Sequence, residues 1–241
     1  MNSTKNIFTK LHKILIELVP YAPLTYAGIV NKLLNDALKR NSLISARLLD
    51  IGCGRGTMMD SLRLHRGIYK IGIDLFEPYL KEAKLKRRYD DVVVADTRYL
   101  PFRERAFNMI IALHLIEHVG KEDGFKLIKS LENLSKNFIL FVTPLGHMHI
   151  DVVDNNPYQV HLSAWYPSEF RTLGYKVKGL WLKIIWGDKG IAKKLPTPMQ
   201  KITVLLNYLF APLAYLFPES AGCIIAYREF QVKRDNYVSP S

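Results

Sequence analysis

A glycine-rich turn at the end of a short apolar run constrains this chain more than any other stretch of its sequence. The run Leu48–Ile51 leads into Gly52-Cys53-Gly54-Arg55-Gly56, and helix-like residues follow. Because glycine has no Cβ, such a turn adopts positive φ angles and lets a ligand approach the main chain closely. The helix start beyond it offers N–H groups without internal partners. The stretch therefore predicts a strand, a ligand-binding loop and a helix, in that order.

Short apolar runs alternate with helix-like segments from residue 46 onward. Strands are expected at 48–51, 69–73, 92–95, 109–113, 138–142, 175–185 and 222–230, and helices at 58–65, 79–88, 124–134 and 167–173. This alternation predicts right-handed βαβ units and a largely parallel sheet. The runs are apolar throughout rather than at every second position, so we expect both faces of the sheet to be covered. The fold class is α/β.

A single domain accommodates all 241 residues, since α/β domains often reach about 250 residues. Three parts follow one another along it: a helical leader (1–45), a cofactor-binding core (46–146) and a substrate-side part (147–241). The leader has apolar stripes at 7–18 and 26–38, typical of helices that pack on a core. Capping a pocket or touching a membrane is the alternative. The last part carries a polar loop at 147–163 and an apolar insertion at 187–219.

Two aspartates stand at the ends of the second and third expected strands. Asp74 comes eighteen residues after Gly56, where a carboxylate can accept hydrogen bonds from ribose hydroxyls. Asp96 ends the third strand, and we expect its carboxylate at the same edge of the sheet, within reach of an adenine amino group. Ligands of open α/β sheets bind at the carboxyl ends of the strands. The loop and both acids are therefore expected to hold one nucleoside.

Together these residues resemble the class I S-adenosylmethionine-dependent methyltransferases. Asp50-x-Gly52-x-Gly54-x-Gly56 is similar to the first motif of that family, and Asp74 and Asp96 are similar to the second and third. Leu113–Val119 resembles the motif that follows in the small-molecule branch, which includes ubiquinone-pathway O-methyltransferases. The resemblance implies a Rossmann-like three-layer sandwich with a mostly parallel seven-stranded sheet. It also implies S-adenosyl-L-methionine as the cofactor and methyl transfer to a small or lipid-like acceptor, with oxygen as the favoured atom.

The resemblance also implies where the parts of the cofactor lie. It puts the methionine part at the glycine loop, the ribose at Asp74, the adenine beside Leu75 and Asp96–Thr97, and the sulfonium near His114. The expected cofactor-binding residues are Asp50, Gly52, Cys53, Gly54, Gly56, Asp74, Leu75, Asp96, Thr97 and His114.

A dinucleotide oxidoreductase is the main rival interpretation. Its fingerprint is G-x-G-x-x-G, whereas here the third glycine comes one residue early and Thr57 occupies the expected position. Asp50 would repel a pyrophosphate but would attract the α-ammonium group of a methionine moiety. These two departures favour the methyltransferase interpretation.

The stretch His114-Leu-Ile-Glu117-His118 also matches the H-x-x-E-H of inverted zinc proteases. That motif needs a helix that presents both histidines on one face, whereas here it follows an expected buried strand. Some quinone-pathway relatives hold a divalent metal with acids at this place. His114 stands where the first of those acids is expected, so we expect no metal.

Methyl transfer to a hydroxyl needs alignment of the nucleophile, the methyl group and the sulfur, and usually a general base. His114 and His118 bracket the expected end of the fourth strand and are the candidate catalytic bases. A backbone contact for the first and packing at a helix start for the second are the alternatives. Asn156–His161 partly resembles the N-P-P-Y box of amino-group methyltransferases, but it follows the fifth strand rather than the fourth. Candidate walls of the acceptor pocket, or else partly buried aromatic residues of a structured loop, are Tyr158, His161 and Trp165.

The chain carries a net charge of +12, which fits polyanionic partners or a cell whose proteins are basic. Its basic residues are scattered, which disfavours nucleic acid. The insertion 187–219 is basic early and apolar from Ile202 to Phe217, a pattern typical of an interfacial segment, of a helix over an apolar pocket, or of core packing. That apolar run is shorter than the roughly 20 residues of a membrane span. The sequence leaves the oligomeric state open.

The sequence also bears on the cellular compartment and on an alternative class of function. Two cysteines exclude a disulfide scaffold and indicate a cytoplasmic protein, with peripheral contact to an anionic membrane as a further expectation. The second class of function is a methyltransferase-like fold that acts as a membrane-associated binding or scaffold protein without turnover. The intact glycine loop and its acids favour retained cofactor binding, but they do not by themselves require turnover.

Overall fold

The computed structural model describes residues 24–230 except 149, 151, 153, 188–189, 197–202, 204–205 and 208. Its strands are β1 (Ala46–Ile51), β2 (Ile68–Asp74), β3 (Asp91–Val94), β4 (Phe107–Leu113), β5 (Ser135–Pro144), β6 (Lys176–Leu182) and β7 (Ala221–Glu229). Its α-helices are α2 (Tyr26–Arg40), α3 (Glu77–Leu85), α4 (Lys121–Leu134), α5 (Pro167–Thr172), α6 (Lys183–Trp186) and α8 (Ala211–Leu216). Short 3₁₀ helices are η2 (Thr57–Ser61), η3 (Ile116–His118), η4 (Pro157–Gln159), η5 (Ile191–Lys194) and η6 (Pro218–Ser220).

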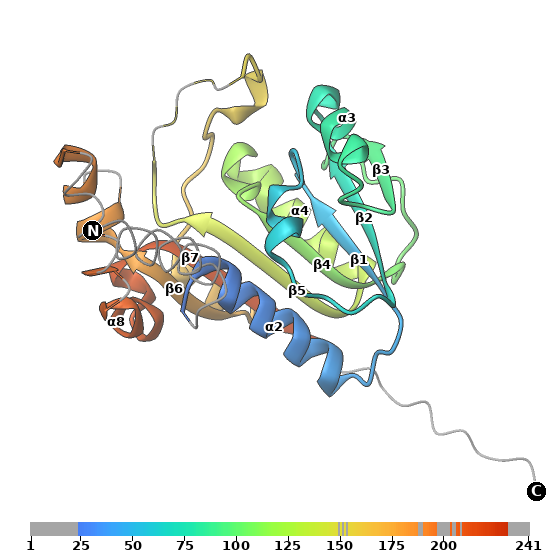
Figure 1. Ribbon diagram of the computed structural model, residues 1–241, viewed down its shortest axis with the longest axis horizontal. Helices are drawn as coiled ribbons and strands as arrows, with labels where there is room; N and C mark the ends of the chain where they lie inside the picture. Colours follow the sequence, from blue (N-terminus) through green and yellow to red (C-terminus); the bar gives the residue numbers. More distant parts are fainter. Residues whose placement is uncertain are drawn as a thin grey trace, which may run out of the picture.

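The seven strands form one sheet in the order β3-β2-β1-β4-β5-β7-β6 (Figure 1). Strands β1 to β5 pair in parallel, whereas β7 is antiparallel to both β5 and β6. Because β5 and β6 both oppose β7, β6 runs in the same direction as β5. Six strands therefore end at one edge of the sheet, and the chain order reverses beside β1. The predicted α/β class with a mostly parallel seven-stranded sheet is confirmed.

Apolar side chains cover both faces of the middle of the sheet, as predicted for buried parallel strands. One cluster joins α4 to the sheet and includes Leu127, Leu131 and Phe141, all buried. The other joins α2 to the opposite face and includes Leu34 and Phe138. Figure 1 shows α2 crossing in front of the sheet. The expectation that this part of the leader packs on the core is confirmed, while the stripe at 7–18 and part of the insertion at 187–219 lie outside the described residues.

The helix predicted at 58–65 is wrong, because only the five-residue 3₁₀ helix η2 follows the glycine loop. The Asn31 side chain of α2 explains why the helix stops. Its amide donates to the carbonyl of Ser61, and its oxygen accepts from the N–H of Arg63. These two bonds satisfy backbone groups that a longer helix would have paired internally.

Other boundaries shift for local reasons. The strand predicted at 175–185 ends at Leu182 and gives way to α6, since Trp181 has a φ of 55° and the N–H of Leu182 bonds the Asn207 side chain. The helix predicted at 79–88 is α3, which starts and ends earlier, with Arg87 at a φ of 51° just beyond it. At the edge strand β3 the expected cover is incomplete: Val92 and Val93 are half-buried and pack against the two core clusters, while Asp91 and Val94 are exposed.

Close packing joins α8 to β6 at Gly179. A Cβ on this residue would collide with the carbonyl oxygen of Ala214 and would stand 2.7 Å from the Cβ of Ala221. The absence of a side chain at Gly179 is therefore what lets α8 lie directly on the sheet. None of the helices among the described residues combines the length and hydropathy needed to cross a bilayer.

Gly179→Ala is expected to lower the free energy of unfolding by about 1–3 kcal/mol, since α8 must move away from β6. Urea unfolding measures the change. Gly120→Ala is the matched control because a Cβ there would meet nothing within 4 Å, and we expect it to change stability by less than about 1 kcal/mol. Equal losses in the two variants would contradict the packing argument.

Candidate cofactor and acceptor site

The structure confirms that the turn after β1 requires glycine. Gly52, Gly54 and Gly56 have φ angles of 67°, 53° and 71°, which only glycine adopts without strain. A Cβ on Gly52 would lie 2.6 Å from Cδ1 of Leu115, and one on Gly56 would lie 2.5 Å from Tyr89. The loop is therefore bare main chain pressed against neighbouring side chains.

Asp74, the last residue of β2, ties this loop to the next turn. One carboxylate oxygen accepts from the N–H of Gly54 and the other from the N–H of Phe76, each at 2.8 Å. Burial raises the pKa of this carboxyl, while these hydrogen bonds oppose the rise. Each carboxylate oxygen can accept more than one hydrogen bond, so Asp74 can still bind ligand hydroxyls.

A cavity of about 420 Å³ opens at the carboxyl-terminal edge of the strands. Seven of the ten candidate cofactor residues line it: Gly52, Gly54, Asp74, Leu75, Asp96, Thr97 and His114. His118 and Tyr158 line it too, together with further residues that the sequence did not single out, among them Leu115, Gln159 and Leu162. The sequence thus predicted a set of residues that the fold brings to one cavity from four separate segments.

Asp50 lies beneath the loop rather than on the cavity wall and is 3% exposed. Its Oδ2 accepts a 2.6 Å hydrogen bond from the hydroxyl of Tyr89, while Oδ1 has no partner. Burial raises the pKa of this carboxyl to about 7; the Tyr89 hydrogen bond lowers it and the charge of Asp74 adds to the rise. An unpaired carboxylate oxygen at this depth is costly, and a cation nearby would offset the cost.

Cys53 and Gly56 belong to the same loop and are the other two candidates that do not line the cavity. The Cys53 thiol is half-buried and contacts the carbonyl of Gly54. Burial raises the pKa of that thiol, so it is a poor nucleophile. Gly56 is buried against Tyr89.

Asp96 lies two residues beyond the end of β3, and its carboxylate pairs with Arg98 at 2.6 Å. Hydrogen bonds from the Arg98 guanidinium hold the pKa of Asp96 below its usual value. The aspartate lines the cavity, as predicted, but its charge is already matched by a neighbour. Leu75, 36% exposed, supplies an apolar surface on the same wall.

His114 follows β4 directly and has a φ of 55°, a strained conformation for a residue with a side chain. Its Nδ1 lies 3.2 Å from Oε1 of Glu117, which is 2% exposed. Burial alone would raise the pKa of Glu117, but the hydrogen bond and charge of His114 hold it below its usual value. A neutral ring whose Nδ1 donates to this carboxylate would have Nε2 as its proton acceptor.

Glu117, His118 and His161 form a second polar group beside His114. One ligand-type atom from each lies within 4.8 Å of the others, and Oε2 of Glu117 is buried without a partner. The His118 and His161 rings meet edge to face, 4.8 Å apart. The chemistry of a carboxylate and two imidazoles fits a divalent transition metal. The sequence argument expected no metal on the ground of His114, and His161 was not considered as a ligand.

Three residues that the sequence offers as acceptor-pocket walls have different positions. Tyr158 lines the cavity and is 51% exposed. His161 stands behind His118, and burial lowers its pKa. Trp165 does not belong to the wall, because it is fully buried and its Nε1 donates to Ser163 and to the carbonyl of Ile116. The prediction for Trp165 is therefore wrong: its ring fills the core beside Gly124 and Phe170.

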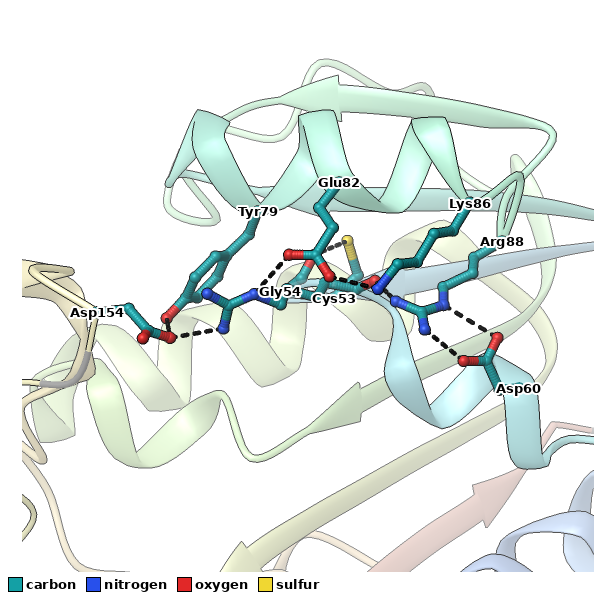
Figure 2. A network of polar contacts seen from close by, with 9 residues as sticks. Cys53, Gly54, Asp60, Tyr79, Glu82, Lys86, Arg88 and Asp154 are labelled. Carbon is teal, nitrogen blue, oxygen red and sulfur yellow. Dashed lines mark hydrogen bonds and ion pairs between the residues drawn. The ribbon is translucent and has the colours of Figure 1, made fainter.

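An ion-pair network holds the glycine loop against the substrate-side loop (Figure 2). The Arg55 guanidinium lies 4.0 Å above the ring of Tyr79. It donates to Glu82 of α3 at 2.8 Å and to Asp154 at 2.6 Å, and the Tyr79 hydroxyl donates to the same Asp154 carboxylate. Arg55 therefore links the cofactor loop to the segment that carries Tyr158.

An aromatic residue of the helical leader lies near the site, although the sequence did not single it out. Tyr26, at the start of α2, lies 5.7 Å from the His114 ring and 6.1 Å from Trp181. Burial, with the charges of Asp50 and Glu117, holds the pKa of its phenol well above the usual value, so the hydroxyl is a donor and not a base. The helical leader thus reaches the site, which periodicity alone did not reveal.

Comparison with known proteins identifies the core of this site. A family model described as a methyltransferase domain matches residues 49–137, which span the glycine loop, Asp74, Asp96 and His114. Residues 49–137 are therefore a methyltransferase domain by sequence. The family recognised from the motifs is confirmed, and S-adenosyl-L-methionine is the cofactor of that family.

Relatives and solved structures agree with this methyltransferase domain. The chain is 30% identical over 131 residues to the ubiquinone biosynthesis O-methyltransferase of Marinobacter nauticus, covering 52% of this chain and 51% of that protein. It is 29% identical over 121 residues to the protein of the same name from Acinetobacter baylyi, covering 48% and 47%. The chain thus spans about half the length of the curated relatives it matches.

The fold is similar to that of the plantazolicin methyltransferase BpumL, solved in complex with SAH. The TM-score is 0.54 and the identity 15%, over 95% of this chain and 92% of that one. At this identity the likeness concerns the fold of the methyltransferase domain, and it extends over nearly the whole chain.

Asp50→Asn tests the buried carboxyl of the methyltransferase domain. A carboxyl whose pKa rises from 3.8 to about 7 on folding stabilises the fold only while protonated, so that contribution is lost as pH rises from about 4 through about 7. We expect the variant to be more stable than wild type by about 2–4 kcal/mol near pH 8 and similar near pH 4.

Urea unfolding across this pH range measures the difference. Asp91→Asn, at an exposed position of β3 where asparagine can still accept from the Tyr69 hydroxyl, is the control and should follow the wild-type curve. A constant offset between Asp50→Asn and wild type at every pH would contradict the raised pKa.

Proposed function

We propose that this chain transfers a methyl group from S-adenosylmethionine to a hydroxyl oxygen of a small or lipid-like acceptor. The observation that carries the proposal is the convergence of the glycine loop, Asp74 and a Glu117-oriented His114 on one cavity. The similarity to O-methyltransferases of ubiquinone biosynthesis supports the choice of oxygen and of an acceptor with an apolar part.

The residues present fit the cofactor. Bare main chain at Gly52 and Gly54 lets a ligand approach closely, and the Asp74 carboxylate is suited to ribose hydroxyls. The unpartnered Oδ1 of Asp50 favours a cation near the loop, as the methionine ammonium would be. When bound, the cofactor supplies a methyl group activated by the sulfonium.

His114 is the base that the geometry favours over His118. Glu117 fixes the His114 ring through Nδ1 at 3.2 Å, which leaves Nε2 to accept the proton of an acceptor hydroxyl. The Nδ1 of His118 lies 3.2 Å from the carbonyl of Val160, so this ring is held to the substrate-side loop. The walls formed by Leu115, Leu162 and Tyr158 suit an acceptor with an apolar part.

Cofactor binding is expected to depend on Asp74. Asp74→Ala removes both the expected ribose acceptor and the hydrogen bond that orders Gly54, so affinity for S-adenosylhomocysteine should fall at least about tenfold. Titration calorimetry measures it. Asp91→Ala changes the first residue of β3, which does not line the cavity, so this variant should bind S-adenosylhomocysteine as wild type does. A wild-type chain that binds neither this ligand nor S-adenosylmethionine would remove the proposed function.

Methyl transfer is expected to depend on His114. A screen of phenolic and lipid-like hydroxyl compounds with methyl-labelled cofactor identifies an acceptor, and His114→Asn should then lower kcat on the order of 10²–10⁴-fold. Asparagine tolerates the positive φ of this position, so the backbone need not move. His118→Asn, which leaves the Glu117-bound ring in place, should lose less. The alternative, a membrane-associated binding protein without turnover, requires cofactor binding with no transfer to any acceptor class.

A further inference from the structure

Large apolar side chains are exposed together in the insertion between β6 and β7. They come from α6, η5 and the segment that ends with α8, and they are Ile184, Ile191, Leu206, Leu209, Phe210, Leu213, Leu216 and Phe217, each 40–67% exposed. We call this set the apolar face. Eight large apolar side chains exposed on one insertion are more than the single exposed residues of ordinary surfaces, and they indicate a place of interaction.

The orientation of α8 is the reverse of a helix that packs on a core. Its small residues Ala211 and Ala214 face the protein, at 6% and 0% exposure, while Leu213 and Leu216 face outward at 47% and 63%. A helix normally turns its large apolar side chains inward. Here Gly179 admits only the alanine face, because a Cβ would strike the Ala214 carbonyl. The fold therefore holds the leucines outward.

The segment that carries the apolar face has a positive net charge. Between Lys176 and Phe217 the sequence has seven lysines, no arginine and one acidic residue, Asp188. This segment alone supplies half of the net charge of +12. Among its described residues, Lys183 on α6 and Lys194 on η5 are exposed, and Lys178 lies 4.5 Å over the ring of Tyr215 on α8.

An apolar face on a segment that is rich in lysine and has no arginine matches one kind of partner best. Anionic lipid headgroups attract clustered lysines, and the acyl region accepts exposed leucine and phenylalanine. A protein interface would be enriched in arginine and depleted of lysine, and this segment is the opposite. We propose that the apolar face docks this chain on an anionic lipid bilayer.

The position of the apolar face relative to the sheet determines which side of the molecule would face the bilayer. The insertion leaves β6 at its carboxyl-terminal end, the same edge at which β5 ends and the cavity opens. Docking there places the cavity side of the sheet toward the lipid. This inference does not depend on methyl transfer, since a bilayer can bind the apolar face whether or not an acceptor is methylated in the cavity.

Co-sedimentation of the full chain with vesicles tests the docking. We expect binding to vesicles of equal parts phosphatidylcholine and phosphatidylglycerol, little binding to phosphatidylcholine alone, and weaker binding as salt screens the lysines. Leu213→Glu combined with Leu216→Glu should lower the partition coefficient by roughly tenfold or more. Affinity for S-adenosylhomocysteine, measured on the same samples, reports whether each variant is folded.

The matched control places the same two charges elsewhere. Ile44 and Leu85 are 88% and 83% exposed and lie outside the insertion, so Ile44→Glu with Leu85→Glu should bind vesicles nearly as wild type does. Equal loss in both double variants would overturn the proposal, because net charge alone would then explain it. Wild-type chain that stays unbound with anionic vesicles would overturn it too, as would a dimer that the Leu213 and Leu216 changes dissociate.

Discussion

The hydrogen bonds from Gly54 and Phe76 to the Asp74 carboxylate hold the site together. They join two turns that follow neighbouring parallel strands, and the turn after β1 is followed only by the five-residue η2, whereas the turn after β2 leads into α3. Hydrogen bonds to a charged acceptor each contribute about 1.5–3 kcal/mol. Because β1 and β2 are in register from Ala46 and Ile68 onward, the sheet delivers the loop and the carboxylate to each other before any ligand arrives.

Burial divides the acids of the site by role. Asp74 and Asp96 have their charge matched, by main-chain N–H groups and by Arg98 respectively. Asp50 and Glu117 keep one oxygen each without a partner among the described residues. Folding tolerates such groups only where another gain offsets the cost. A positively charged ligand bound beside them would offset that cost.

Sequence reasoning succeeded where a pattern has one physical explanation. A glycine triplet after a strand needs positive φ, and an acid at the end of the next strand must reach the same edge, so most cofactor-side candidates line the cavity. It failed where the outcome depended on distant partners. Nothing near residue 60 reveals that Asn31 will stop the helix, and nothing near Trp165 reveals that it packs against Gly124. Tyr26 and Tyr89 were missed because a lone tyrosine in a helical or loop segment carries no signal.

The antiparallel strand β7 has a consequence for the order in which the molecule is completed. It is the last strand in the described chain, yet it lies between β5 and β6, so β6 has no partner until residues 221–229 have been synthesised. Until then the edge of β5 is unpaired, and the insertion lacks the strand that follows it in the sheet. Strands β1 to β5 can pair earlier, because all their parallel partners lie within residues 46–144. Strands β6 and β7 and the insertion between them are then the portion most exposed to misassembly during translation.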